Sequence, residues 1–193
     1  MVLRSGALPA PLKVLEERTV GPTLGSDSIR SGIIAILVSA LFVFLFMLIY
    51  YRKSGIIADI SLVVNLTLNL ACLSAFGATL TLPGLAGLAL SIGMAVDANV
   101  LIFERIKDEL RNGADRDAAV AAGFNKALTA ILDSNLMNLF AALILYYFGT
   151  GSVRGFAVTL SIGVLSTIFC ACFASKGAFE YFSLKGRRSP ISI

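Results

Sequence analysis

The sequence predicts an all-α membrane protein, a bundle of five transmembrane helices with a short cytoplasmic surface helix. Of its 193 residues, 57% are hydrophobic and the mean hydropathy is +0.86, far outside the balance of a soluble domain. Five apolar stretches reach the roughly 20 residues that a helix needs to cross a bilayer. One of them contains a carboxylate, Asp97, and charged side chains are rare in membrane helices unless they have a use.

The apolar stretches define the predicted spans and the loops between them. In chain order, the predicted spans are 33–51, 56–76, 82–103, 128–148 and 156–182. All connections are short except 104–127, which is charged. We expect one or two short surface helices there, broken near Asn112 and Gly113, because this dipeptide favours a turn.

The distribution of Lys and Arg predicts the orientation of the bundle. Most of these residues lie in the first loop, in 104–127 and in the C-terminal tail 184–193, so these segments are expected on the cytoplasmic side. The bundle, 31–183, then leaves the N-terminal tail 1–30 outside. That tail has no apolar signal sequence but does contain a strand-like stretch, 13–20. We therefore interpret it as the remnant of a missing periplasmic domain that an upstream span once carried.

The third predicted span contains the first candidate site residue, Asp97. Two stripes of small residues run along this span: one comprises Ala86, Leu90, Gly93 and Asp97, and the other Gly87, Ser91 and Ala95. Small residues let a second helix approach closely, so Asp97 is expected to face protein and not lipid. The hypothesis is that Asp97 carries protons, and the alternative is a structural pair with another buried polar group.

A second carboxylate, Asp133, lies in the fourth span. By residue count, Asp97 lies about 9 Å and Asp133 about 7.5 Å from the cytoplasmic ends of their spans, so the two are expected at similar depth. Two neighbouring carboxylates can share and release one proton, as a proton-coupling site requires. The alternatives for Asp133 are a helix-capping role or a position in the wet interface.

Further polar residues occur within the spans. The supporting candidates are Asn65, Asn69, Asn135 and Asn138. They either belong to a proton pathway or form plain hydrogen bonds between helices. Asp59 is expected to be interfacial and solvated, and Asn99 should point about 160° away from Asp97 on a regular helix. Glu104 and Lys107 are expected on a solvated cytoplasmic helix face.

Several classes of chemistry are excluded by the composition. The chain has no His, and its three Cys lie in apolar segments, where they act as small hydrophobic residues. It contains no phosphate-binding glycine loop, no nucleophile paired with His and no zinc-ligand spacing. We therefore expect no enzyme, cofactor, metal or catalytic residue. The balanced charges of 104–127 also argue against nucleic acid as a partner.

Several sequence blocks carry a family resemblance. These blocks are 6–11, 14–21, 55–66, 82–113, 131–136 and 148–163. The most specific is GMAVDANVLIFERIKDELRNG, from Gly93 to Gly113. In these blocks the chain resembles the SecD family of bacterial protein-export subunits, which is related to the resistance–nodulation–division exporters.

This resemblance implies a multi-pass protein of the bacterial inner membrane. It implies a SecF-like subunit, a SecYEG-type channel and a translocating preprotein as partners, with the proton-motive force assisting export. The proton-coupling Asp of the family maps onto Asp97. The chain departs from the family at Met137 and Asn138, where the family usually has a Thr pair. Two other functions stay open: a fragment of a small-molecule or lipid exporter of the same superfamily, or a non-functional truncated membrane subunit.

Overall fold

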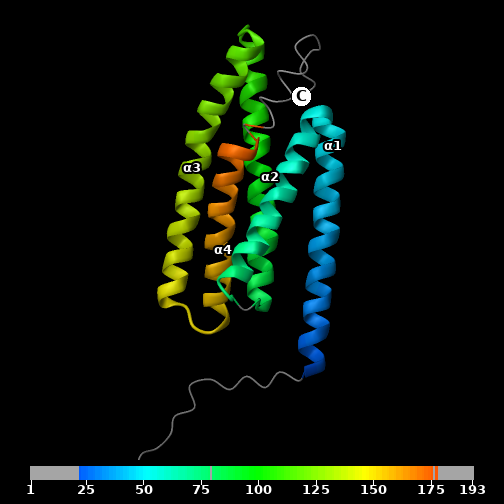
Figure 1. Cartoon of the computed structure of the whole chain (residues 1–193), viewed down its shortest axis with the longest axis vertical. Helices are drawn as coiled ribbons and strands as arrows, with labels where there is room; N and C mark the ends of the chain where they lie inside the picture. The colour runs from blue at the N-terminus through cyan, green and yellow to red at the C-terminus, as the bar shows by residue number, and fades with distance from the viewer. Residues whose placement is uncertain (1–21, 79, 176, 178–193) are drawn as a thin grey trace, which may run out of the picture.

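The molecule is a bundle of long antiparallel helices (Figure 1). The computed structural model describes residues 22–78, 80–175 and 177. The elements are α1 (Pro22–Ala75), α2 (Leu82–Arg111), α3 (Arg116–Phe148), α4 (Ser152–Phe169) and the π-helix η2 (Cys170–Ser175). These described residues contain no β-strand, and five of the helical segments are long and apolar enough to span a membrane. The predicted fold class is therefore confirmed.

Helix α1 is two helices joined at a sharp bend. Arg52 interrupts it with φ 48° and ψ −115°, a backbone conformation that non-glycine residues rarely adopt. The first half of α1, Gly25–Arg52, runs to the bend, and the second half, Ser54–Ala75, returns beside it (Figure 1). A side chain at Gly55 would lie 2.1 Å from the Met47 carbonyl oxygen, so only glycine lets the two halves approach so closely.

The connection 104–127 differs from its prediction. It forms no separate surface helix, because α2 continues to Arg111 and α3 already begins at Arg116. The expected break near Asn112 and Gly113 is correct, and Gly113 has a positive φ of 86°. We call the end of the bundle with this turn and the Arg52 bend the hairpin end; Figure 1 shows both features together.

Small residues on α3 explain why the helices continue past their apolar stretches. A side chain at Gly123 would meet Ile106 at 2.6 Å, and Ala119 and Ala127, one turn to either side, are fully buried. This stripe brings α3 against the extension of α2. Packing between α2 and α3 therefore stabilises the parts of these helices that extend beyond the apolar, membrane-length stretches.

The ends of the bundle also differ from the predicted boundaries. The predicted tail 1–30 ends earlier, because α1 begins at Pro22, a residue that favours the first turn of a helix. The expected strand at 13–20 lies outside the described residues, as does the tail 184–193. The fifth span begins at Ser152, not at 156, and is described as far as Ser175.

The most buried helices are α2 and α4. Half of the most apolar window of α2 is buried, against 6% for the first half of α1. The main apolar cluster lies near the hairpin end, where Met47, Ile106 and Ile131 are fully buried or nearly so. The first half of α1 is buried mostly near the bend, and farther along Ile36 still packs on the bundle while most of its other side chains are exposed.

Candidate functional site

The two small-residue stripes of α2 have opposite environments. Gly87, Ser91 and Ala95 belong to the buried side. A side chain at Gly87 would lie 3.1 Å from Thr159 of α4, and one at Gly163 would lie 2.7 Å from Ser91. These small residues let α4 pack closely against α2, as expected for this stripe.

The stripe that contains Asp97 faces outward. Ala86, Leu90, Gly93 and Asp97 are all exposed on this chain. A side chain at Gly93 would meet nothing within 4 Å. No described helix of this chain packs on Gly93 or Asp97, so the expectation that Asp97 faces protein and not lipid stays a prediction about a second subunit. The reason is geometric: α1, α3 and α4 pack on the remaining sides of α2 and leave this one uncovered.

Asp133 also faces outward, on α3. Asn138 donates a hydrogen bond to the Met94 sulfur at 3.4 Å, which fixes the register of α3 against α2. From that contact, Asp97 lies three residues and Asp133 five residues toward the hairpin end, so their depths differ by about 3 Å. Neither carboxylate makes a hydrogen bond or ion pair within the part of the chain that the structure describes.

A column of polar side chains runs through the interior on the other side of α2. Asn69 donates to the Ser91 hydroxyl at 2.8 Å, and Asn65 donates to the Thr167 hydroxyl at 3.3 Å. Both asparagines are almost fully buried. They therefore connect the second half of α1 to α2 and to α4 by hydrogen bonds between helices.

Three further residues extend this column, and the sequence analysis missed two of them. The Ser175 hydroxyl of η2 donates to the side-chain amide oxygen Oδ1 of Asn99 at 2.6 Å and lies 2.9 Å from the Ser61 hydroxyl. The signal for Asn99 was present, since it follows Ser91 and Ala95 at helical spacing. Ser61 and Ser175 gave no such signal, because only the folded chain brings them together.

The two candidate asparagines of α3, Asn135 and Asn138, have separate roles. Asn135 is buried and donates to the Ile131 carbonyl of its own helix at 2.8 Å. Asn138 is half-buried and reaches α2 at Met94. Asn138 therefore connects α3 to α2, whereas Asn135 is bonded within its own helix.

Asp59 is not solvated as expected. Its exposed fraction is 7%, and neither carboxylate oxygen has a hydrogen-bond partner among the described residues. Asp59 shares a helix face with Gly55 and Leu62, which both pack inside the bundle. Asp59 was expected to contact solvent because it lies near the end of its span. The first half of α1, which packs beside that end, instead shields it from solvent.

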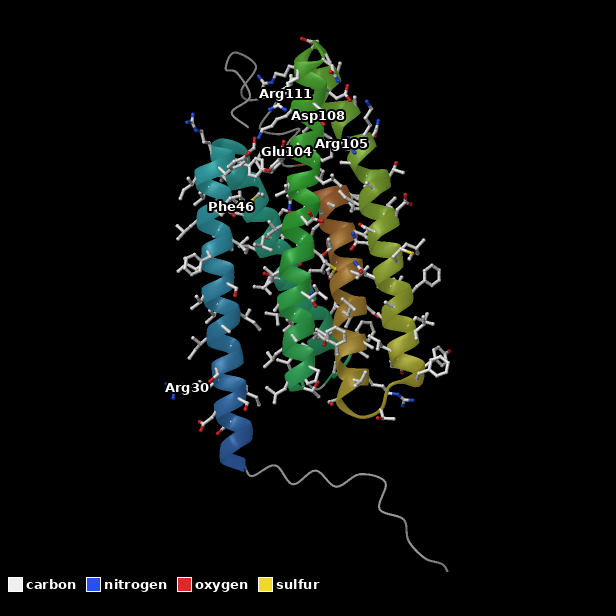
Figure 2. The ribbon with its side chains drawn as sticks, turned by 180° about the vertical axis from the view of Figure 1, so that it is seen from behind. Arg30, Phe46, Glu104, Arg105, Asp108 and Arg111 are labelled. Atoms are coloured by element: carbon white, nitrogen blue, oxygen red, sulfur yellow. The ribbon has the colours of Figure 1, made fainter. Side chains whose placement is uncertain are left out.

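Glu104 accepts two hydrogen bonds at the hairpin end. The Tyr51 hydroxyl donates to its Oε1 at 3.1 Å, and the Lys107 Nζ donates to the same oxygen at 2.9 Å. The Lys107 Nζ also lies 4.7 Å from the centre of the Tyr51 ring. The expected solvated face is therefore correct for Glu104, whose side chain is 40% exposed and which lies beside Arg105 and Asp108 (Figure 2), but not for Lys107, which is 17% exposed. Glu104 also links α2 to the bend through Tyr51.

No cluster of three or more His, Cys, Asp or Glu that could hold a metal ion occurs in the residues that the structure places. The arrangement offers instead two exposed carboxylates at similar depth and an inner polar column. The inner column forms hydrogen bonds between helices.

Comparison with known proteins identifies relatives over almost the whole chain. Residues 7–185 match the model of the family "Protein export membrane protein SecD/SecF, C-terminal". The protein translocase subunit SecD of Syntrophobacter fumaroxidans is 54% identical over 193 residues, and that of Calditerrivibrio nitroreducens is 57% identical over 179 residues. The alignments cover 100% and 93% of this chain, but only 36% and 35% of those relatives.

A solved structure shows the same helical arrangement. The crystal structure of SecDF from Thermus thermophilus, a translocon-associated membrane protein, aligns with a TM-score of 0.87 at 48% identity. The alignment covers 98% of this chain and 26% of that one. A second SecDF structure, in a super-membrane-facing form, aligns with a TM-score of 0.81 over 96% of this chain and 25% of that chain. The chain thus spans about a third of the length of its curated relatives and a quarter of the solved SecDF.

Proposed function

The chain belongs to the SecD/SecF C-terminal family of protein export membrane proteins, and from that premise we propose that it is the membrane portion of a SecD-like translocase subunit. In this proposal it lies in the bacterial inner membrane and uses the proton-motive force to assist export of preproteins through a SecYEG-type channel. The hairpin end carries Arg52 and most charged residues of the bundle, and this supports a cytoplasmic position for it.

The observation that carries the proposal is the outward position of Asp97. A charged side chain that faces acyl chains at the centre of a membrane costs about 2.5–3.5 kcal/mol or more. Another protein surface that covers the stripe would remove this cost, and Gly93 keeps the stripe flat enough for a helix to pack on it. We assign this surface to a SecF-like subunit, so that Asp97 lies between the two subunits.

Proton coupling follows from this location. Protonation removes the charge of Asp97 and so changes which packing of the two subunits is more stable. A proton that crosses the membrane releases about 2.3 kcal/mol per 100 mV, enough to bias two conformations of similar energy. In this proposal Asp133 supplies the second carboxylate at a similar depth and Asn138 a polar contact between α3 and α2, whereas Asn65 and Asn69 connect the interior helices.

The test is Asp97→Asn in the chain together with the subunits that co-purify with it. Preprotein export is measured with and without a proton gradient. We expect the variant to lose the gradient-dependent part of export, because an amide cannot release a proton. Asp117→Asn, at an exposed position in the first turn of α3, is the matched control and should export normally. Full gradient-dependent export by Asp97→Asn would show that this carboxylate does not couple protons.

A further inference from the structure

Asp59 is a buried carboxylate that the proposed function leaves unused. Its exposed fraction is only 7%, and both carboxylate oxygens lack a hydrogen-bond partner among the described residues. Buried polar groups without a partner are rare and call for an explanation. Asp59 is buried whereas Asp97 is exposed on this chain, so the two carboxylates have different environments.

The neighbours of Asp59 on its helix face show what covers it. Gly55, one turn before it, lies against the Met47 carbonyl of the first half of α1. Leu62 and Leu66, one and two turns after it, line a groove of about 120 Å³ between the two halves of α1 and α2. Since these positions share one face, Asp59 faces the first half of α1 between the Gly55 contact and the groove.

The groove offers Asp59 no polar partner. Its lining residues are Ala40, Phe44, Leu62, Val63, Leu66, Thr67, Leu70 and Ile92. The one hydroxyl among them, on Thr67, donates to the Val63 carbonyl of its own helix at 2.8 Å. The groove is therefore a hydrocarbon surface.

The described helical stretches beside Asp59 carry no cation. The chain has no Lys, Arg or His from 54 to 104, none from 31 to 51 and none from 155 to 175. The other titratable groups of these segments are engaged or turned away: Tyr51 donates to Glu104, and Asp97 faces outward. Cys170 of η2 is buried and adds no positive charge.

An ionised carboxylate in such a place would cost many kcal/mol, and such a group takes up a proton instead. We propose that Asp59 is a proton-binding site of the bundle interior, which holds a proton while the two halves of α1 are packed together. The proton leaves for water when the halves separate, and a proton from water returns to the same carboxylate oxygen when they close. No other bond forms or breaks in this step.

The geometry of α1 supports such a separation. Only 6% of the most apolar window of its first half is buried, so the contacts that oppose its movement away from the bundle are concentrated near the bend, which can act as the hinge. The bend itself is strained, because Arg52 has a positive φ. Asp59 is only two turns beyond the bend, where a small rotation of the first half would uncover it.

The test is infrared spectroscopy of the chain in lipid bilayers with its co-purifying subunits. At neutral pH the parent should show the carbonyl stretch of a protonated carboxylic acid. Asp59→Asn should lose this component, whereas Asp117→Asn and Asp97→Asn should keep it. Asp59→Leu serves as a second variant if the amide perturbs folding, and circular dichroism checks that each variant is helical.

A second measurement follows the exchange of the proton. After transfer to D2O, the Asp59 component should shift more slowly than the amide bands of exposed helix ends, because exchange requires α1 to open. The proposal is overturned if the parent shows no band of a protonated carboxylic acid, which is the result expected if Asp59 is ionised and paired with a cation of the bend. It is also overturned if Asp59→Asn keeps the band in full. A shift as fast as mixing would show that α1 does not cover the carboxylate. The outcome for Asp97→Asn in export does not affect this result.

Discussion

Two glycines in the spans allow a test that distinguishes a surface packed within this chain from a surface proposed to pack against another chain. A side chain at Gly163 of α4 would lie 2.7 Å from both Cβ and Oγ of Ser91 and 3.3 Å from the amide nitrogen of Asn69. A side chain at Gly93 of α2 would meet nothing within 4 Å. Both glycines lie inside helices, so the same substitution, glycine to alanine, can be compared at the two surfaces.

The structure sets the size of each effect. Alanine is favoured over glycine within a helix by about 0.5–1 kcal/mol, and this gain applies to both sites. At Gly163 a contact of 2.7 Å forces α2 and α4 apart or moves Ser91, and such overpacking costs about 1–3 kcal/mol. It also strains the Asn69–Ser91 hydrogen bond. We therefore expect Gly163→Ala to be less stable than Gly93→Ala by about 1–3 kcal/mol.

The assay is reversible unfolding of each purified variant in mixed micelles, followed by circular dichroism. Gly93→Ala should match or exceed the parent in stability, and Gly163→Ala should fall below it. Gly93→Leu then tests the proposed subunit interface: it should unfold like the parent but recover less of the SecF-like subunit on co-purification. A Gly93→Ala variant that is as unstable as Gly163→Ala would refute the outward position of the Asp97 stripe.

Two further predictions concern hydrogen bonds between helices. Asn69→Leu and Ser91→Ala should each lower the free energy of unfolding, and their double-mutant cycle should give a coupling of about 0.6–1.7 kcal/mol in the same unfolding assay. An additive pair would mean that the bond contributes nothing. Tyr51→Phe removes the hydroxyl that donates to Glu104, so we expect a loss of about 1.5–3 kcal/mol and faster amide hydrogen exchange on both sides of the Arg52 bend. Unchanged exchange would show that Glu104 does not fasten the bend.

The number of spans and their approximate ends could be predicted from the sequence. Apolar stretches of membrane length must be helical, since lipid offers no partner for backbone amides, and this rule needs no knowledge of neighbours. The same rule failed for 104–127, which is polar enough to lie in water. Its helices persist because Gly123 and Ile106 pack against each other, a contact between residues far apart in the chain.

Helical periodicity also predicted which residues share a face. It placed Gly87, Ser91 and Ala95 on one stripe and Gly93 and Asp97 on another, and it turned Asn99 away from Asp97. Periodicity does not say which stripe a neighbour covers. The structure buries the first stripe and exposes the second.

The sequence by itself therefore determined the membrane helices, the polar positions within them and their division into faces, because these depend on local composition and on 3.6 residues per turn. Only the tertiary structure decided that Asp97 is outward and Asp59 enclosed. The burial of a side chain depends on which helix stands beside it. Here the bend at Arg52 folds the first half of α1 back toward Asp59, while no helix among the described residues covers the Asp97 stripe.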